Sequence, residues 1–246
     1  ARGGTVIRME TASPAGYSLS AARLAVRGLV RGVGRLAYRL LARPEVHGLE
    51  NVPPRGPYLI AFNHSSIFDP PFLITHWPAA PEVLAEADLW QEKGRKMWVR
   101  LYGGIPIRRG QYDRRALEST LAALRAGARL MIAPEGRVNS GLGLLQGRLG
   151  LGWILSQAPV PVVPVGVTGS TLEFMRKLRA GKRPRVVLRI GRAIESVPVD
   201  SRDKAAMQRR VDTVMAHIAA LLPLEERGFY AEMAEGVLSG QMEPRF

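Results

Sequence analysis

The sequence predicts an α/β fold. From Glu45 onward, short apolar runs alternate with stretches of helical periodicity, as expected when helices connect the strands of a sheet. The chain has 246 residues, which is enough to bury the core of one large domain without a second one. It contains no cysteine, which excludes disulfides, cysteine-ligated zinc and a thiol nucleophile and is compatible with a reducing compartment.

The first predicted element is a basic amphipathic helix from Ser18 to Arg43, which follows a segment, residues 1–17, that is rich in Gly, Thr, Ser and Pro and is expected to be disordered. Arginine recurs at every fourth position of the helix and apolar residues fill the remaining arc. The arginines are Arg23, Arg27, Arg31, Arg35, Arg39 and Arg43. The apolar residues are Val26, Leu29, Val30, Val33, Leu36, Ala37 and Leu40.

This helix has two interpretations. In one, the apolar arc packs on the domain and the arginines are solvated. In the other, the helix lies in a membrane interface. The second is favoured, because like charges four residues apart and the three glycines Gly28, Gly32 and Gly34 weaken an isolated helix that an anionic partner would help to order.

The remaining elements follow from periodicity and from capping residues. Asp113 is a suitable N-cap for a helix that Gly127 would end, and a last helix is expected to start near Asp200 or Ser201 and to bury an apolar stripe. The uncharged stretch from Leu149 to Leu172 is interrupted by three prolines, so we expect a helix end, a loop and a buried strand there rather than a membrane span. The candidate strands are Tyr58–Phe62, Glu82–Ala85, Ile105–Ile107, Arg129–Ala133, Val162–Val167 and Arg185–Ile190.

The formal net charge is +14, which predicts a phosphate-bearing partner: a nucleic acid, an anionic lipid or a small substrate. The four histidines are scattered without metal-ligand spacing, so no metal site is expected. No Gly-x-Ser-x-Gly elbow occurs, so the usual α/β-hydrolase serine is absent. No P-loop or dinucleotide-binding glycine pattern occurs after a strand, and no organic cofactor is implied.

A candidate catalytic pair, His64 and Asp69, follows directly after the apolar run Tyr58–Phe62. If the chain turns from a strand into a helix there, Asp69 can fold back to accept the proton of the histidine Nδ1. The Nε2 atom is then free to take a proton from a hydroxyl group. The pair therefore predicts a general base and the residue that orients it.

Two further segments place arginines after short apolar strands. Arg108 and Arg109 follow Ile105–Ile107, and Arg137 follows Ala133-Pro134-Glu135-Gly136. Ligand sites of open α/β sheets gather in the loops that leave the strand ends, so Arg109 and Arg137 are candidates to converge on His64 and bind phosphate. The alternative for each arginine is a surface ion pair of structural origin.

These segments resemble, in order and approximate spacing, the four sequence blocks of the glycerolipid acyltransferase family, and among its members the lysophosphatidic acid (1-acylglycerol-3-phosphate) acyltransferases. The similarity covers roughly Glu45 to Ile194. Four ordered motifs are a much stronger signal than one. The blocks are Asn63-His64-x4-Asp69, Gly103-x-Ile105-x-Ile107-x-Arg109, Pro134-Glu135-Gly136 with Arg137, and Val162-Val163-Pro164-Val165.

The resemblance implies a mixed, mostly parallel central sheet flanked by helices. It also implies transfer of a fatty acyl chain from acyl-CoA or acyl carrier protein to the sn-2 hydroxyl of 1-acyl-glycerol-3-phosphate, which gives phosphatidic acid. His64 would be the general base and Asp69 would hold its tautomer, without an acyl-enzyme. The expected substrate-binding residues are Asn63, Arg109, Glu135, Gly136 and Arg137.

Because a lysophospholipid acceptor resides in a bilayer, the resemblance also predicts a peripheral or monotopic protein on the cytoplasmic face of an anionic membrane. The expected organisation is residues 1–43 as the disordered start and interface helix, 44–200 as the catalytic domain, and 201–246 as a C-terminal helix and tail packed on it. The alternatives are an acyltransferase for another acceptor, such as glycerol-3-phosphate or another lysophospholipid, and a basic nucleic-acid-binding protein. The last is supported by charge alone, and no recognisable nucleic-acid module is present.

The sequence departs from the family pattern at two positions. The third block usually reads Glu-Gly-Thr-Arg-Ser, whereas here Arg137 comes one residue early and Val138 stands where the arginine is expected. Relatives often carry a lysine where this chain has Glu86. Near an anionic substrate a carboxylate would be repulsive, so Glu86 either indicates a different acceptor head group or faces away from the site.

Overall fold

A computed structural model describes residues 17–92, 96–108, 113–141 and 143–242. Two of the sequence predictions fall outside these ranges: the disorder of residues 1–16, and Arg109 as a phosphate ligand. Tyr17, the last residue of the segment expected to be disordered, is partly buried, and its hydroxyl donates a hydrogen bond to Glu82.

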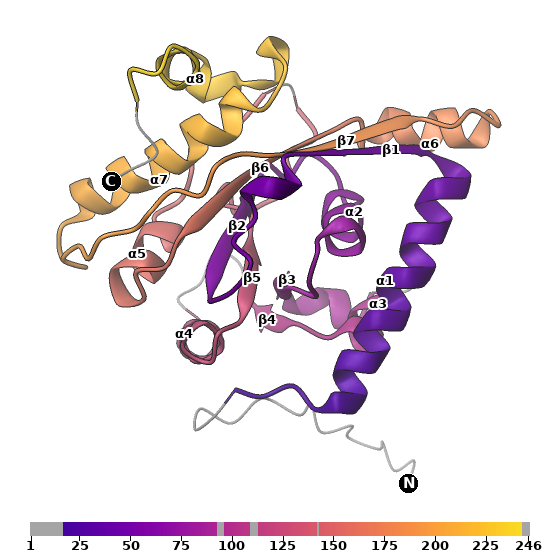
Figure 1. The fold of residues 1–246 in the computed structure, drawn as a ribbon, viewed down its shortest axis with the longest axis horizontal. Coiled ribbons are helices and arrows are strands. Elements are labelled where there is room, and N and C mark those ends of the chain that lie inside the picture. Colours follow the sequence, from indigo (N-terminus) through magenta and orange to yellow (C-terminus); the bar gives the residue numbers. More distant parts are fainter. Residues whose placement is uncertain (1–16, 93–95, 109–112, 142, 243–246) are drawn as a thin grey trace, which may run out of the picture.

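The core of the fold is a seven-stranded sheet in the order β1-β7-β6-β2-β5-β3-β4 (Figure 1). All neighbouring strands are parallel except β6 and β7, which are antiparallel, so the predicted mixed, mostly parallel sheet is confirmed. The strands are β1 (Arg43–His47), β2 (Tyr58–Phe62), β3 (Glu82–Glu86), β4 (Ile105–Ile107), β5 (Arg129–Ile132), β6 (Val162–Thr168) and β7 (Arg185–Ile190).

The helices begin and end largely where capping chemistry indicates. Asp113 caps α4 by accepting a hydrogen bond from the amide of Ala116 at 3.1 Å, and Gly127 behind the helix has φ +85°, as predicted. The last long helix starts slightly later than expected, because Asp203 rather than Asp200 is its N-cap. The helices are α1 (Ala21–Leu41), α2 (Asp69–His76), α3 (Lys96–Tyr102), α4 (Arg114–Arg125), α5 (Gly150–Gln157), α6 (Leu172–Arg179), α7 (Lys204–Ala220) and α8 (Ala231–Leu238).

The sheet has a hydrophobic core on each face. On β2 the side chains alternate: Leu59 and Ala61 belong to the core under α4, α5 and α7, whereas Tyr58, Ile60 and Phe62 belong to the core under α2 and α6. Figure 1 shows α4, α5 and α7 on one side of the sheet and α1 and α2 on the other. The central strand β2 is buried along its whole length, so the loop that leaves its carboxyl end is held from both faces.

Helix α1 turns several of its arginines inward. Arg27 forms a buried ion pair with Glu82 at 2.9 Å and donates to the carbonyl of Tyr102 at 2.8 Å. Arg31 and Arg35 donate to carbonyls in the last turn of α2, which lack partners inside their own helix. The interpretation in which all the arginines are solvated and the apolar arc packs on the domain is therefore wrong.

The apolar side of α1 faces outward instead. Four leucine and valine side chains at helical spacing are at least half exposed on this side. None of the helices in the described part of the chain combines the length and the apolar content that crossing a bilayer requires. The exposed side chains are Leu29, Val33, Leu36 and Leu40.

Candidate active site

The loop between β2 and α2 brings His64 and Asp69 together. Strand β2 ends at Phe62 and α2 begins at Asp69, so the chain turns from strand to helix where the sequence predicts it. The Nδ1 atom of His64 lies 3.2 Å from Oδ2 of Asp69, and both side chains are buried. The predicted contact is present, with the histidine just beyond the carboxyl end of the central strand.

The carboxylate of Asp69 is held by two further donors. The backbone N–H of Ser66 donates to Oδ2 at 2.7 Å, and the hydroxyl of Ser170 donates to Oδ1. Asp69 also lies in the first turn of α2, where the helix dipole favours a negative charge. The ionised carboxylate accepts hydrogen bonds and does not donate them, so this arrangement places the proton of the neutral His64 ring on Nδ1 and leaves Nε2 as the basic nitrogen.

Asn63 connects the end of β2 to β6. Its amide nitrogen donates to the carbonyl of Val167 at 2.9 Å, and its amide oxygen accepts from the Val167 N–H at 2.7 Å. Both polar ends of this buried side chain are therefore occupied by backbone. The structure gives Asn63 an anchoring role next to His64, and its predicted contact with substrate stays a prediction.

Glu135 links the third sequence block to the first. Its Oε1 accepts the backbone N–H of His64 at 3.1 Å, and its Oε2 accepts the N–H of Leu145 at 3.0 Å. Burial raises the pKa of Glu135, while the hydrogen bonds from Leu145 and His64 act in the opposite direction. This buried carboxylate fixes the backbone that carries the histidine.

Gly136 permits the tight turn that follows Glu135. Its φ is +70°, in the left-handed region, and a Cβ atom there would lie 2.7 Å from Cδ of Arg148. The next residue, Arg137, is exposed, and among the described residues no hydrogen bond or ion pair to its side chain is found. A structural ion pair therefore does not account for Arg137, and the residue is available to a ligand.

The second arginine segment lies further from the histidine in the sheet. Its strand β4 is the edge strand, separated from β2 by β5 and β3. Arg109 itself lies outside the described residues, so its convergence with His64 stays a prediction.

A mainly apolar groove of about 480 Å³ opens beside the β2–α2 loop. One wall is the loop itself, the second is the segment after the third block, and the third is α6. Two arginines of α6 are among its lining residues. The lining residues are Ser65, Ser66, Ile67, Phe68, Val138, Ser140, Met175, Arg176 and Arg179.

Sequence reasoning missed Ser170 and the α6 wall of the groove. Ser170 lies two residues after the end of β6, the strand of the fourth block, and its contact with Asp69 spans 101 positions of sequence. Because β6 is parallel to β2 and adjacent to it, the residues after both strands meet at the same edge of the sheet. The sequence signal that could have identified Ser170 is therefore its position shortly after the fourth block.

The site has the composition of a hydroxyl-activating centre. A buried histidine oriented by a buried aspartate can accept a proton from a hydroxyl group at Nε2, and the neighbouring apolar groove suits a substrate with a hydrocarbon portion. In the described parts of the chain no group of three or more His, Asp or Glu side chains is arranged to hold a metal ion. The fold and site define an α/β protein with a histidine–aspartate centre beside a lipid-compatible groove.

The family model described as Acyltransferase matches residues 43–168, half of the chain, and this protein belongs to that family. The match includes β1 to β6 and both members of the histidine–aspartate pair. The family predicted from the four sequence blocks is thereby confirmed.

Two relatives extend this result. Over 191 residues the chain is 27% identical to 1-acyl-sn-glycerol-3-phosphate acyltransferase alpha of Bos taurus, which covers 76% of this chain and 66% of the bovine protein. The chain thus spans just under two thirds of the length of that relative. The crystal structure of the 1-acyl-sn-glycerophosphate (LPA) acyltransferase PlsC from Thermotoga maritima superimposes with a TM-score of 0.58 at 23% identity, covering 77% of this chain and 78% of PlsC, and shares its fold.

Proposed function

We propose that this protein transfers a fatty acyl chain from an acyl thioester, acyl-CoA or acyl carrier protein, to the sn-2 hydroxyl of 1-acyl-glycerol-3-phosphate. The observation that carries the proposal is the buried pair of His64 and Asp69 at the end of β2, within the part of the chain that matches the acyltransferase family. The product would be phosphatidic acid, which places the reaction in phospholipid biosynthesis.

In this mechanism Nε2 of His64 accepts the proton of the acceptor hydroxyl as its oxygen attacks the thioester carbonyl. The new carbon–oxygen bond gives a tetrahedral intermediate. Its collapse breaks the carbon–sulfur bond, and the imidazolium returns the proton to the departing thiolate. Asp69 stabilises the imidazolium and keeps the ring oriented, and Ser170 and the Ser66 amide hold Asp69 in place.

We assign the substrate phosphate to the arginines that surround the site. Arg137 is exposed and lies two residues after Glu135, whose carboxylate accepts a hydrogen bond from the His64 backbone, so a phosphate held by Arg137 would lie near the catalytic histidine. Gly136 gives this loop its turn and Asn63 anchors the opposite side of the site. No metal or organic cofactor is required by this chemistry.

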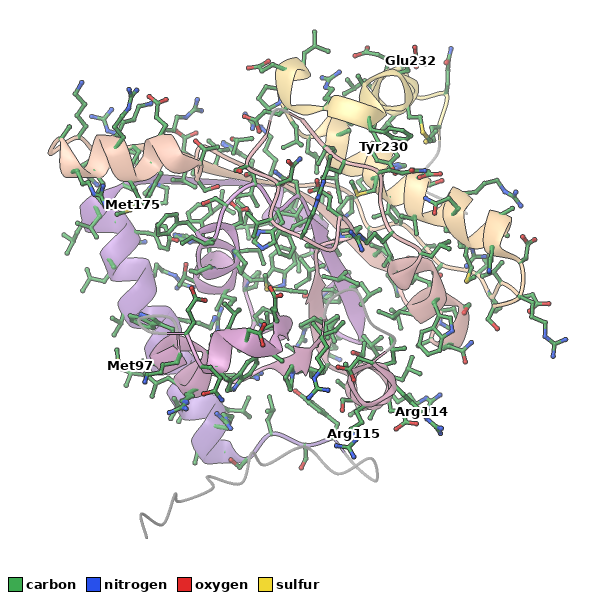
Figure 2. The ribbon with its side chains drawn as sticks, turned by 180° about the vertical axis from the view of Figure 1, so that it is seen from behind. Met97, Arg114, Arg115, Met175, Tyr230 and Glu232 are labelled. Carbon is green, nitrogen blue, oxygen red and sulfur yellow. The ribbon has the colours of Figure 1, made fainter. Side chains whose placement is uncertain are left out.

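The outward apolar side of α1 supports docking at a membrane interface. Helix α3 packs against α1 and adds the exposed side chains of Met97, Trp98 and Leu101 (Figure 2 labels Met97 beside α1). A helix with an exposed apolar side binds in the headgroup region of a bilayer, where a lysophospholipid acceptor also lies. We propose a peripheral association with the cytoplasmic face of the membrane through this surface.

The function is tested by acyl transfer from radiolabelled acyl-CoA, and separately from acyl carrier protein, to a panel of acceptors. The panel contains 1-acyl-glycerol-3-phosphate, glycerol-3-phosphate and neutral or zwitterionic lysolipids. We expect the first to be the preferred acceptor and His64→Ala to abolish its turnover. Equal turnover by wild type and His64→Ala would overturn the mechanism, and preference for another acceptor would overturn the substrate assignment.

A further inference from the structure

We infer that Arg176 and Arg179 of α6 share the binding of the acceptor phosphate with Arg137 and so set the preference for an anionic head group. The inference rests on the proposed acyl transfer and adds binding residues that lie beyond residues 43–168, the part of the chain matched by the family model. It follows from the composition of the groove, from the residue found at the third block, and from the way α6 is attached.

The groove beside the histidine is mainly apolar, and its charged side chains come from α6. Ile67, Phe68 and Met175 line its apolar part, whereas Arg176 and Arg179 contribute the positive charge. A lysolipid has one phosphate next to a single hydrocarbon chain, so a groove with apolar walls and a cationic border matches both of its parts. The nucleotide portion of coenzyme A is polar over most of its surface and matches such a groove poorly.

The residue of the third block that lines this groove is apolar. Val138, at the position where the family pattern has an arginine, lines it, whereas Arg137 does not. An apolar side chain therefore occupies the wall at the expected arginine position. The two α6 arginines line the same groove from another element and supply positive charge there.

Helix α6 is fixed to the catalytic loop, which gives its arginines a defined position. The ring of Phe174 is buried and lies 5.2 Å from the ring of Phe68, one residue before Asp69. Lys177 lines a separate basic hollow instead of this groove, whereas Met175 of the same helix, labelled in Figure 2, lines the groove. The helix thus presents only some of its cations to the catalytic site.

The two arginines differ in their existing partners. Arg176 lies 2.9 Å from Glu173 in an exposed pair, which is weak in water and easily exchanged for a phosphate. Among the described residues no hydrogen bond or ion pair to Arg179 is found, so its guanidinium has no competing carboxylate. Arg179 is therefore expected to contribute the larger share of phosphate binding.

The test compares Arg176→Ala/Arg179→Ala with Lys177→Ala in neutral detergent micelles, where no anionic surface contributes. Lys177 is a matched control, because it lies on the same helix and is also paired with Glu173, at 3.5 Å, but faces the other hollow. We expect the double variant to raise KM for 1-acyl-glycerol-3-phosphate about tenfold or more, with kcat and KM for acyl-CoA nearly unchanged, and Arg179→Lys to recover part of the loss. Lys177→Ala should behave like wild type.

Three results would overturn the inference. They are an unchanged acceptor KM in the double variant, an equal rise in Lys177→Ala, and a rise confined to KM for acyl-CoA. The second would indicate a general effect of surface charge, and the third would assign the arginines to the donor. All three are observed on an active wild-type enzyme, whereas absence of acyl transfer by wild type would instead refute the proposed function.

Discussion

Replacing Asp69 by asparagine separates the charge of this residue from its geometry. Asparagine has the same shape, and its amide oxygen can still accept hydrogen bonds from His64 and the Ser66 amide. Its NH2 group then faces Ser170, whose hydroxyl can rotate to become the acceptor. The substitution therefore keeps the network satisfied while it removes the negative charge beside the imidazole.

The expected loss of stability is small and the expected loss of activity is large. Three hydrogen bonds to an ionised acceptor become neutral ones at a cost of about 1 kcal/mol each, and relief of a fully buried charge offsets part of this cost. We expect the free energy of unfolding to fall by roughly 2 kcal/mol or less. The imidazolium that forms during the reaction loses its counter-charge, which lowers kcat by about a thousandfold or more.

The assay pairs urea unfolding with single-turnover acyl transfer at saturating acceptor. Ser170→Ala is the matched control, since it removes one hydrogen bond from Asp69 but leaves the charge, and should lower kcat by only about tenfold. If Asp69→Asn retains kcat within tenfold of wild type while it unfolds normally, Asp69 does not stabilise the charged histidine and the proposed mechanism is refuted.

Three further predictions concern the rest of the molecule. Glu82→Gln leaves Arg27 charged and uncompensated in the interior, and we expect the free energy of unfolding to fall by about 3–5 kcal/mol in urea denaturation; a loss below 1 kcal/mol would contradict the importance of this pair. Leu36→Glu/Leu40→Glu should weaken co-flotation with anionic liposomes at least about tenfold, whereas Leu238→Glu, an exposed position on α8, should not; equal flotation of all three proteins would refute docking through α1. Burial lowers the pKa values of His76 and His217 below 6.5, so the unfolded chain binds protons that the folded chain does not, and the free energy of unfolding should fall as pH is lowered below 6.5. Urea denaturation from pH 7.5 to 5.5 measures this dependence. If the slope of the free energy of unfolding against pH does not decrease in His217→Gln, the prediction is contradicted.

Elements with local sequence signals were predicted well. The strand Tyr58–Phe62 was located to the residue, because five consecutive apolar residues are bounded by Pro57 and Asn63. Helix α4 has both a capping aspartate and a terminating glycine. Strand β1 was missed, because Arg43, Pro44 and Glu45 have low strand propensity and the strand depends on its pairing with β7 at the sheet edge.

The features that sequence reasoning missed depend on contacts between distant segments. The arginine period of α1 predicted the helix but not the direction of its basic side, which is set by carbonyls at the end of α2 about 40 residues away. Ser170 and the α6 wall reach the site because β6 lies beside β2. A motif search finds the residues next to one strand end, whereas the sheet topology determines which other strand ends join them.

The inward arginines of α1 also bear on how the proposed catalytic site would be oriented at a membrane. Arg31 and Arg35 attach α1 to the end of α2, the helix whose first turn contains Asp69. The apolar side of α1 is therefore coupled through one short helix to the catalytic loop. Docking of α1 at the interface would set the angle at which the groove beside His64 meets the bilayer, and a lysolipid could enter it with its head group still near the surface. A solvated surface helix would direct Arg31 and Arg35 to water. In this protein they instead connect the proposed membrane contact to the proposed site of the reaction.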